Sequence, residues 1–563
     1  MTNWGESMRS GTTVTVVPAE WRWVIVVSLL MILAAFSPYL WMIFVGATDT
    51  QWQFMGILHS YQAGGIHLSA MTQGAQGDWL THFLHTPEAH DGVFFDAVYT
   101  FLGQVSGAIG LPSITIFHVA RAVASFFMYM ALYQLAASIW MRLRTRRIFL
   151  VLVIVGGGFG WLLGPLTNDI SYFDLSVPIA YPFQASLIDI HTPFTIGCMA
   201  LIASVLIPVF RPGATDTPGV SNSGVWVFIL SLVLMFVEPL ALVPMIVTMI
   251  LYVSYTAYRQ RGLPVRESQW LLWFGVPALP MTVYYVALLT YNTVVSEVWF
   301  QLHDVPAPSL PVLILSLGFL FIISLPGLLR AVRSFEADGD RFMLLWFVVI
   351  LVLLYLPTRV HLSFTIGIMI PVAYFATRSL EDFWFNYMAR RWRFRVLVAF
   401  LPLVAASHLF VLYLPVRPIL SGNLVHASGL LLQRDYGDAF DWLRLRVRDN
   451  DVVLASPNVG LWLPARTGST VVYGHPRMTL EPTEKQRALN DWYASETVSE
   501  ACFRLLDGDF SAYGSYQVRY VLVGPQERSL GAAGCVDSLE PRFVNGTVEI
   551  YEYVPALLTE RVD

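Results

Sequence analysis

Long apolar runs separated by short polar stretches fill the first 415 residues of the chain. A helix needs about 20 predominantly apolar residues to cross the hydrocarbon core of a membrane. The first run, residues 23–45, has no small-residue cleavage site after it and is interpreted as an anchor rather than a signal peptide. The run 224–258 is too long for one crossing and carries Glu238 and Pro239 in its middle, so it predicts two spans joined by a tight turn. The other predicted spans are residues 113–140, 148–166, 193–210, 270–290, 310–329, 342–357, 362–377 and 396–414.

This pattern predicts an α-helical polytopic membrane protein with about eleven transmembrane helices. The apolar stretch 93–111 is interrupted by Asp96, Gln104 and several glycines, and we expect it to lie in the membrane interface instead of crossing. Beyond residue 416 the apolar runs shorten to strand length, at residues 451–456, 469–473, 518–523 and 547–553. Polar helical stretches, residues 435–448 and 482–506, alternate with these strands and predict a small α/β domain.

The predicted organisation therefore has three parts. Residues 1–22 form a cytoplasmic N-terminus, residues 23–415 form the membrane domain with a large outer loop at 46–112, and residues 416–563 form a soluble α/β domain.

Composition and charge support the membrane location and give it a direction. Hydrophobic residues make up 56% of the chain and charged residues only 13%, against about 25% in an ordinary soluble domain. Arginine clusters at residues 142–147, 259–266, 330–341 and 378–395, which the positive-inside rule assigns to the cytoplasm. The segments 46–92, 167–192 and 292–309 contain no lysine or arginine and should face the other side. We therefore expect a multi-pass protein of the plasma (inner) membrane, with its N-terminus cytoplasmic and its C-terminal domain extracytoplasmic.

The small net charge of -5 argues against a nucleic-acid partner. No spacing of cysteine and histidine resembles a zinc site, so no metal site is predicted from motifs. Of the three cysteines, Cys198 falls in a span, whereas Cys502 and Cys535 fall in the predicted outer domain. A disulfide between the latter two and a pair of buried thiols are equally compatible with the sequence. Asn545 begins a glycosylation sequon of the kind that often occurs by chance.

The first outer loop is the leading candidate for a functional site. It contains Asp49, Asp78, Glu88 and Asp91, and it also holds several histidines and aromatic residues. A long loop of this composition is costly to order and is more often functional than a short connection. Its carboxylates can act as a general base or hold a divalent cation. The alternative is an interfacial belt of tryptophan and tyrosine with acids that only hydrate the loop.

Further candidates lie at the edges of the spans. Asp174 is in the second outer loop, and Asp189 and His191 come directly before a span, although capping of a helix by Thr192 explains part of that pattern. Arg121, inside a span, and Arg359, at an outer span end, are candidates for holding a phosphate. Structural ion pairs or snorkelling side chains are the simpler interpretation for these arginines.

The order of these features resembles the GT-C superfamily of membrane glycosyltransferases, which includes the protein mannosyltransferases and aminoarabinose transferases. The resemblance covers residues 20–415 as architecture, and its motifs are short. They are residues 46–49, 76–79, 86–88, 98–103, 117–121, 182–183, 191–193 and 355–359. The C-terminal domain is similar to the outer α/β domains that bacterial members append.

The resemblance implies transfer of a sugar from a polyprenyl-phosphate donor to an acceptor (a glycan, lipid or protein) at the outer face of the membrane. By position, Asp49 matches the catalytic acid of the family, and Glu88 is the second catalytic candidate; Asp174, His191, Arg121 and Arg359 would bind substrate. A divalent cation is an optional cofactor in this scheme. Bacterial relatives carry an acid where this chain has Gly64 and Gly65, a departure that bears on activity.

Two other classes of function remain open. A transporter or lipid flippase would also have many spans and intramembrane charges such as Arg121 and Glu238, but no inverted repeat is evident in the sequence. A non-catalytic assembly protein for envelope polymers would fit the loss of the first-loop acid.

Overall fold

The structure is a computed structural model. It describes residues 16–48, 51–212, 214, 216–219, 222–336, 338–422, 424–427, 429–448, 451–509 and 511–554. The chain forms two compact units, each assembled from separate segments. Unit 1 comprises residues 1–36, 119–285 and 305–414, and unit 2 comprises residues 37–118, 286–304 and 415–563.

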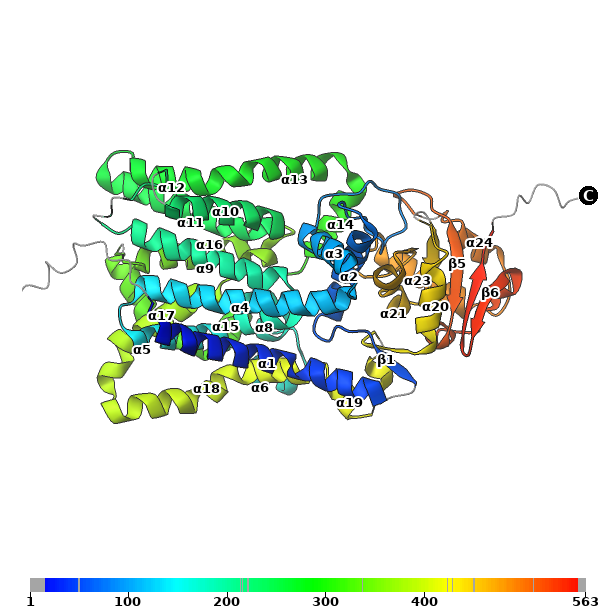
Figure 1. The fold of residues 1–563 in the computed structure, drawn as a ribbon, viewed down its shortest axis with the longest axis horizontal. Helices are drawn as coiled ribbons and strands as arrows, with labels where there is room; N and C mark the ends of the chain where they lie inside the picture. Colours follow the sequence, from blue (N-terminus) through cyan, green and yellow to red (C-terminus); the bar gives the residue numbers. More distant parts are fainter. Residues whose placement is uncertain are drawn as a thin grey trace, which may run out of the picture. The chain divides into compact units, whose positions relative to one another are not determined.

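Unit 1 is a bundle of helices, several of which run side by side in Figure 1. Long apolar stretches form these helices, and their buried faces share one large core cluster. The helices that lie wholly or mainly in unit 1 are α1 (Pro18–Thr48), α4 (Ser113–Ile139), α5 (Leu143–Val155), α6 (Gly160–Thr167), α7 (Phe173–Ser176), α8 (Pro182–Ile188), α9 (His191–Val209), α10 (Asn222–Val237), α11 (Pro239–Gln260), α12 (Val265–Gly275), α13 (Leu279–Tyr291), α15 (Leu310–Ser334), α16 (Asp340–Leu354), α17 (Met369–Asp382) and α18 (Arg390–Tyr413).

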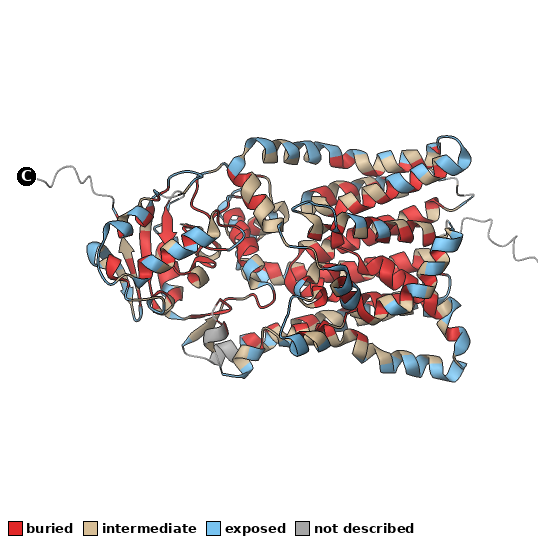
Figure 2. Cartoon of the chain, turned by 180° about the vertical axis from the view of Figure 1, so that it is seen from behind, coloured by how far each residue is buried: buried red, intermediate tan, exposed pale blue. Residues whose placement is uncertain are grey.

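Nine helical stretches among the described residues are long and apolar enough to cross a membrane. Each of the eleven predicted spans coincides with helix, and the two that fall short of this length are α10 and α16. The predicted fold class is therefore confirmed, whereas the number of crossings stays a prediction. The stretch that contains α17 is central, with 89% of its most apolar window buried, whereas α18 is peripheral at 22%. Figure 2 shows the same contrast between buried inner helices and exposed outer ones.

Two helices of unit 1 are broken where they meet. Residues 156–158 are all glycine and separate α5 from α6 within one predicted span. Opposite them, α15 contains Gly318 with φ 61°, a conformation that L side chains rarely adopt. A Cβ atom on Gly158 would come within 2.2 Å of the Ser316 carbonyl oxygen, so only glycine permits this approach. The apolar pattern of the sequence did not predict these breaks.

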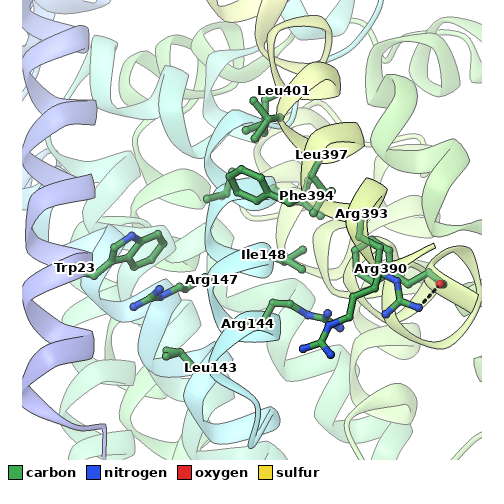
Figure 3. A pocket seen from close by; sticks show the side chains of 14 residues that line it. Trp23, Leu143, Arg144, Arg147, Ile148, Arg390, Arg393, Phe394, Leu397 and Leu401 are labelled. Atoms are coloured by element: carbon green, nitrogen blue, oxygen red, sulfur yellow. Dashed lines mark hydrogen bonds between the residues drawn. The ribbon is translucent and has the colours of Figure 1, made fainter. Parts of the chain in front are cut away.

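The arginine-rich ends of α5 and α18 lie close together in unit 1, as Figure 3 shows. On α5, Arg146 is buried and its guanidinium donates to Glu20 of α1 at 2.8 Å. The Tyr133 hydroxyl of α4 donates to the same carboxylate at 2.7 Å. This group of three side chains joins the arginine-rich end of α5 to α1 and α4.

Unit 2 combines the loop at 46–112 with the C-terminal part of the chain. The loop forms α2 (Tyr61–Gln76) and α3 (Ala97–Ile109), and segment 286–304 supplies α14 (Thr293–His303). Ile66, Phe83, Val295 and Met478, which come from all three segments, belong to one buried cluster. This shared core explains why the loop groups with residues 415–563, whereas sequence analysis placed it in a membrane domain spanning 23–415.

Helices α2 and α3 pack closely because glycines line their contact. A Cβ atom on Gly103 would come within 2.1 Å of the Met71 carbonyl oxygen, and one on Gly74 would come equally near the Thr100 carbonyl oxygen. Helix α3 falls inside the stretch predicted to be interfacial. Strand β1 (Trp52–Phe54) pairs antiparallel with β2 (Leu431–Gln433) and connects the loop to the C-terminal segment.

A five-stranded mixed sheet forms the C-terminal part of unit 2, in the order β4-β3-β5-β7-β6. Its strands are β3 (Val452–Leu454), β4 (Thr470–Val471), β5 (Val518–Val523), β6 (Glu540–Asn545) and β7 (Val548–Glu552). The longer helices around it are α20 (Asp435–Arg444), α23 (Pro482–Ala494) and α24 (Glu500–Leu506). The predicted α/β domain is thus confirmed. Sequence analysis missed β6 of this sheet, and it also missed β1 and β2.

A disulfide joins Cys502 and Cys535, whose Cα atoms are 5.7 Å apart. This decides between the two alternatives that the sequence left open. Cys198 is a free, buried thiol in α9, as expected for a residue inside a span.

Candidate functional site

Three ionisable side chains of unit 1 meet at the beginning of α9. Asp189 follows α8, and its carboxylate accepts hydrogen bonds from the Thr192 backbone N–H at 2.8 Å and the Thr192 hydroxyl at 2.9 Å. Thr192 is the second residue of α9 and donates these bonds instead of accepting one, so the predicted capping by Thr192 is wrong. The bonds instead tie the beginning of α9 to Asp189. They also fix the orientation of a carboxylate that is only 5% exposed.

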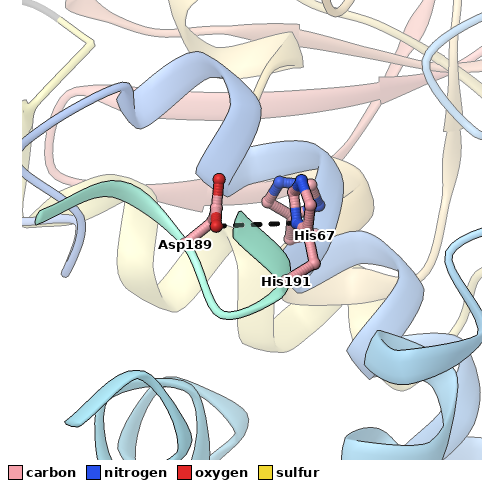
Figure 4. A group of neighbouring side chains, drawn as sticks. All are labelled: His67, Asp189 and His191. Carbon is pink, nitrogen blue, oxygen red and sulfur yellow. Dashed lines mark ion pairs between the residues drawn. The ribbon is translucent and has the colours of Figure 1, made fainter. Parts of the chain in front are cut away.

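His191 is the first residue of α9, and its ring lies between two carboxylates. Its Nδ1 is 3.7 Å from Asp189 Oδ1 (Figure 4). Its Nε2 is 3.9 Å from Oε2 of Glu238, the residue that joins α10 to α11. We call Asp189, His191 and Glu238 the acid–histidine cluster. Its members sit next to helix N-termini, where the helix dipole favours negative charge.

The chemistry of this cluster suits a cation. Two carboxylates around one imidazole concentrate negative charge, which a bound metal ion would offset. Carboxylate oxygen and imidazole nitrogen are ligands for divalent ions such as Zn²⁺ and Mn²⁺. The side chains of His191 and Glu238 are 17% and 15% exposed, so both remain accessible to a ligand.

Arg121 of α4 supports the segment that carries the cluster. It is completely buried and donates from Nη1 to the Leu187 carbonyl oxygen at 2.5 Å, two residues before Asp189. Its guanidinium also lies over the Phe36 ring, 4.3 Å from the centroid. Because burial restricts its access to a ligand, this position favours an orienting role over direct contact with a phosphate.

Asp174 lies in α7, and its carboxylate accepts hydrogen bonds from residues outside the acid–histidine cluster. One of its oxygens accepts from the Gly160 backbone N–H at 2.9 Å and from the Ser407 hydroxyl at 2.5 Å. The side chain is fully buried, and burial raises the pKa of this carboxyl above its ordinary value, against the effect of the Ser407 hydrogen bond. Asp174 thus holds α6 against α18 beside the glycine break, which favours a structural role.

Glu88 belongs to unit 2 and forms a buried ion pair with Lys485, the single lysine of the chain. Both side chains are 0% exposed. The Glu88 carboxylate also accepts from the Thr86 hydroxyl at 2.5 Å and the Ser511 hydroxyl at 2.6 Å. Glu88, Lys485, Thr86 and Ser511 therefore form one hydrogen-bonded group. A carboxylate surrounded by three donors is poorly placed to take a proton from a substrate, so this environment favours a structural role.

The two remaining predicted site residues lie at exposed or undescribed positions. Arg359 is exposed in the connection between α16 and the 3₁₀ helix His361–Thr365. Asp49, which directly follows α1, lies outside the described residues. Their predicted roles stay predictions.

Sequence analysis noted Asp189 and Glu238 but assigned neither to the site. The position of Asp189 two residues before His191 was the available signal for the first. For Glu238, the signal was a lone carboxylate within an apolar run, because such charges tend to mark sites. The pairing of Lys485 with Glu88, 397 residues away, left no local signal.

No family model and no curated protein matches this sequence. Solved structures do. ArnT from Cupriavidus metallidurans bound to undecaprenyl phosphate superposes with a TM-score of 0.53 at 11% identity, covering 96% of this chain and 99% of that one. The Archaeoglobus fulgidus oligosaccharyltransferase tethered with an acceptor peptide gives 0.50 at 12% identity, covering 90% and 69%.

The same oligosaccharyltransferase in complex with Zn and sulfate also gives 0.50, at 13% identity, covering 89% of this chain and 68% of that one. At these identities the likeness concerns the fold. The chain shares the fold of these solved structures, which agrees with the fold that its sequence resemblance implies.

Proposed function

We propose that the chain is a membrane glycosyltransferase that moves a sugar from a polyprenyl-phosphate donor to an acceptor at the outer face of the membrane. The observation that carries this proposal is the acid–histidine cluster at the helix N-termini of a GT-C fold. A neighbour with this fold, ArnT from Cupriavidus metallidurans, was solved with undecaprenyl phosphate, which supports a lipid-phosphate donor.

Asp189 and His191 would hold a divalent cation in this proposal, with Glu238 as a further carboxylate near the imidazole. The oligosaccharyltransferase with the same fold was solved in complex with Zn and sulfate, which supports a metal ion as a ligand of this fold. Such an ion would supply positive charge to the donor phosphate. The chain itself contributes ligand orientation, because Thr192 fixes the Asp189 carboxylate.

Asp49 is proposed as the base that takes a proton from the acceptor hydroxyl, which requires hydrogen-bond reach of about 3 Å. Arg359, being exposed at an outer span end, is the proposed contact for the lipid phosphate, because guanidinium can donate two hydrogen bonds to phosphate oxygens. Arg121 would act through the 187–191 segment that it supports. Glu88 and Asp174 would maintain the fold.

The deciding experiment compares two aspartates of the second outer loop. Asp189→Asn keeps an oxygen for Thr192 and removes the charge, so we expect the variant to fold. Transfer should fall about 10²- to 10³-fold, a range typical of removing one electrostatic group or metal ligand from an active site. Asp169→Asn is the matched control, because Asp169 is an exposed loop residue that accepts from Ser171. Transfer from a panel of polyprenyl-phosphate sugars would be measured with the purified proteins.

Equal activity of the Asp189 and Asp169 variants would remove the cluster from the mechanism. A parent protein that transfers no sugar from any donor of the panel would overturn the enzyme proposal itself. Titration with Mn²⁺ and with a chelator would test the cation separately, because chelation should lower transfer by the parent but leave donor binding measurable.

The orientation is proposed from the arginine distribution and has its own test. Reporter fusions at Gly262, between α11 and α12 in a basic loop, and after Val554, beyond the sheet of unit 2, should give opposite signals. Equal signals would contradict an odd number of crossings between these positions and thereby the outer location of unit 2.

Transport is the second candidate, because discontinuous helices are typical of transporter binding sites and α5–α6 and α15 are broken at residues 156–158 and at Gly318. The two candidates differ in their chemical product. Reconstituted protein that moves a labelled polyprenyl-phosphate sugar across a bilayer without cleaving it would favour transport.

A further inference from the structure

A cavity of about 770 Å³ opens at the arginine-rich end of unit 1, away from the acid–histidine cluster. Its walls come from α5, α18, Trp23 of α1 and Phe385 (Figure 3). The volume is within the range of ordinary small-molecule sites, about 300–1,000 Å³. We call it the arginine pocket.

The arginine pocket is basic at one end and apolar along its walls. On α5, Leu143, Arg144 and Arg147 come first, and Ile148, Val151 and Leu152 follow at helical spacing. On α18, Arg390 and Arg393 come first, and Phe394, Leu397, Val398 and Leu401 follow. Both helices thus run from guanidinium groups into apolar side chains, and Phe394 is 75% exposed. An anion with a long apolar tail matches this gradient.

The positive charge of the pocket is only partly neutralised. Its lining includes four arginines and no acidic residue. Arg144 is paired with Glu381, which lies outside the lining. Arg147 lies 4.8 Å from the Trp23 ring centroid, and its Nε is shielded from solvent without a hydrogen-bond acceptor among the described residues. Arg390 is exposed and has no ion pair with any described residue.

The remaining arginine, Arg393, is held in place by backbone acceptors. It donates to the Phe385 carbonyl oxygen at 2.6 Å and to the Met388 carbonyl oxygen at 3.2 Å. The neighbour Arg146, on the other face of α5, is instead neutralised by Glu20. The charge of the pocket is therefore a feature of one face of α5 and not of the whole arginine-rich segment.

We propose that the arginine pocket binds an anionic phospholipid of the membrane leaflet next to the arginine-rich loops. The lipid phosphate would accept hydrogen bonds from Arg147 and Arg390, and an acyl chain would lie along the apolar residues of α18. Chain connectivity separates this site from the acid–histidine cluster, because Arg144 is near the start of the α5–α6 crossing and Asp189 follows its end. The lipid would be a stable ligand there and not a sugar donor.

Native mass spectrometry of the full-length protein in mild detergent tests this proposal with added phosphatidylglycerol or phosphatidylcholine. We expect one tightly retained phosphatidylglycerol and no comparable retention of phosphatidylcholine. The double variant Arg147→Gln/Arg390→Gln should weaken phosphatidylglycerol binding about 30-fold, from two basic residues near the phosphate. Arg391→Gln/Arg395→Gln is the matched control, since it removes the same charge from residues that do not line the pocket.

Equal weakening by the control would show that only surface charge attracts the lipid, which overturns the proposal. Two competition measurements on the unaltered protein are independent of how any variant folds. Inorganic phosphate that displaces phosphatidylglycerol would show that the pocket takes phosphate without a tail and would also overturn the proposal. Polyprenyl phosphate that displaces it more effectively than phosphatidylglycerol would reassign the pocket to the lipid carrier.

Discussion

Two groups of acidic side chains, one in each unit, show how surroundings separate a site from a structural pair. Glu88 in unit 2 is 0% exposed and has a full positive charge and two hydroxyls around it. Glu238 in unit 1 is 15% exposed and faces a histidine at 3.9 Å. The first arrangement balances a charge that is buried permanently. The second leaves both side chains partly exposed.

The comparison matters because sequence analysis ranked these residues the other way. Glu88 lies in a long polar loop, where acids are expected to be functional, and Glu238 lies in an apolar run. The structure folds the polar loop into a core and puts Glu238 at a helix N-terminus beside His191. Accessibility and charge balance, not loop membership, distinguish the two. The following predictions test that distinction, from the largest expected effect to the smallest.

Lys485→Met should destabilise unit 2 by about 3–5 kcal/mol, because it leaves the Glu88 carboxylate buried without its counter-ion. Hydrogen exchange of peptides from β5 would report the loss of protection. Arg487→Met, an exposed position on the same helix, is the control and should change little. Glu88→Leu combined with Lys485→Met should recover part of the stability. A single variant as stable as the parent would show that the pair does not hold the unit together.

Removing the disulfide by Cys502→Ser with Cys535→Ser should lower the stability of unit 2 by about 3–4 kcal/mol, given loop-closure entropy for a separation of 33 residues. The same exchange experiment should show protection lost in peptides of the sheet and retained in α17. Cys198→Ala serves as the control for cysteine replacement, since Cys198 is a free thiol. Unchanged protection of the sheet would mean that packing alone fixes it.

Glu238→Gln should lower sugar transfer about 10- to 100-fold, as expected for a group that adjusts the ligands of an ion, with little change in melting temperature. Glu88→Gln should do the opposite, lowering the melting temperature more than the turnover of the folded protein. Measuring both quantities for both variants separates the roles. The comparison of the two glutamates fails if Glu88→Gln abolishes transfer in fully folded protein.

Acid should weaken unit 2 through two buried histidines. Burial lowers the pKa of His85 to about 4 and that of His475 to about 3, against an ordinary value of 6.5. The unfolded chain therefore binds more protons than the folded one between these values, and stability is lost as the pH falls below 6.5. Each histidine should cost about 1.6 kcal/mol between pH 6.5 and pH 5.

His475→Gln is the variant that tests this contribution. It should flatten the dependence of unfolding on pH across that range, because one of the titrating groups is gone. An unaltered slope would assign the acid sensitivity to other groups.

Much of the fold follows from patterns that act over short distances. Apolar runs of span length predicted helix, and alternating runs predicted β3, β4, β5 and β7. Strand β6 was not predicted because residues 540–545 form an exposed edge strand of the described sheet that contains Pro541 and pairs with β7 on one side, so no apolar face marks it. The glycine break at 156–158 was not predicted because glycine does not interrupt an apolar run.

Sequence patterns predicted only part of the candidate site. His191 and Asp189 are two residues apart and adjoin a span, so their sequence neighbourhood indicated a shared location. The proximity of Glu238 depends on α10, which ends directly before it, packing against α9, and neither segment predicts that arrangement by itself. The same holds for Arg121, whose burial against Leu187 depends on the packing of α4 and α8. The sequence therefore indicated which residues belong to the site but not which residues contact them from other helices.

The interleaved segments of the two units have a consequence for biosynthesis. Glu88 and Lys485 are 397 residues apart, and translation at about 5–20 residues per second separates their appearance by roughly 20 to 80 s. During that interval the carboxylate of the nascent loop lacks its ammonium partner, and strand β1 lacks β2. Residues 37–118 therefore stay partly folded until the last quarter of the chain emerges from the ribosome. Truncated or stalled chains would expose this segment to chaperones and proteases.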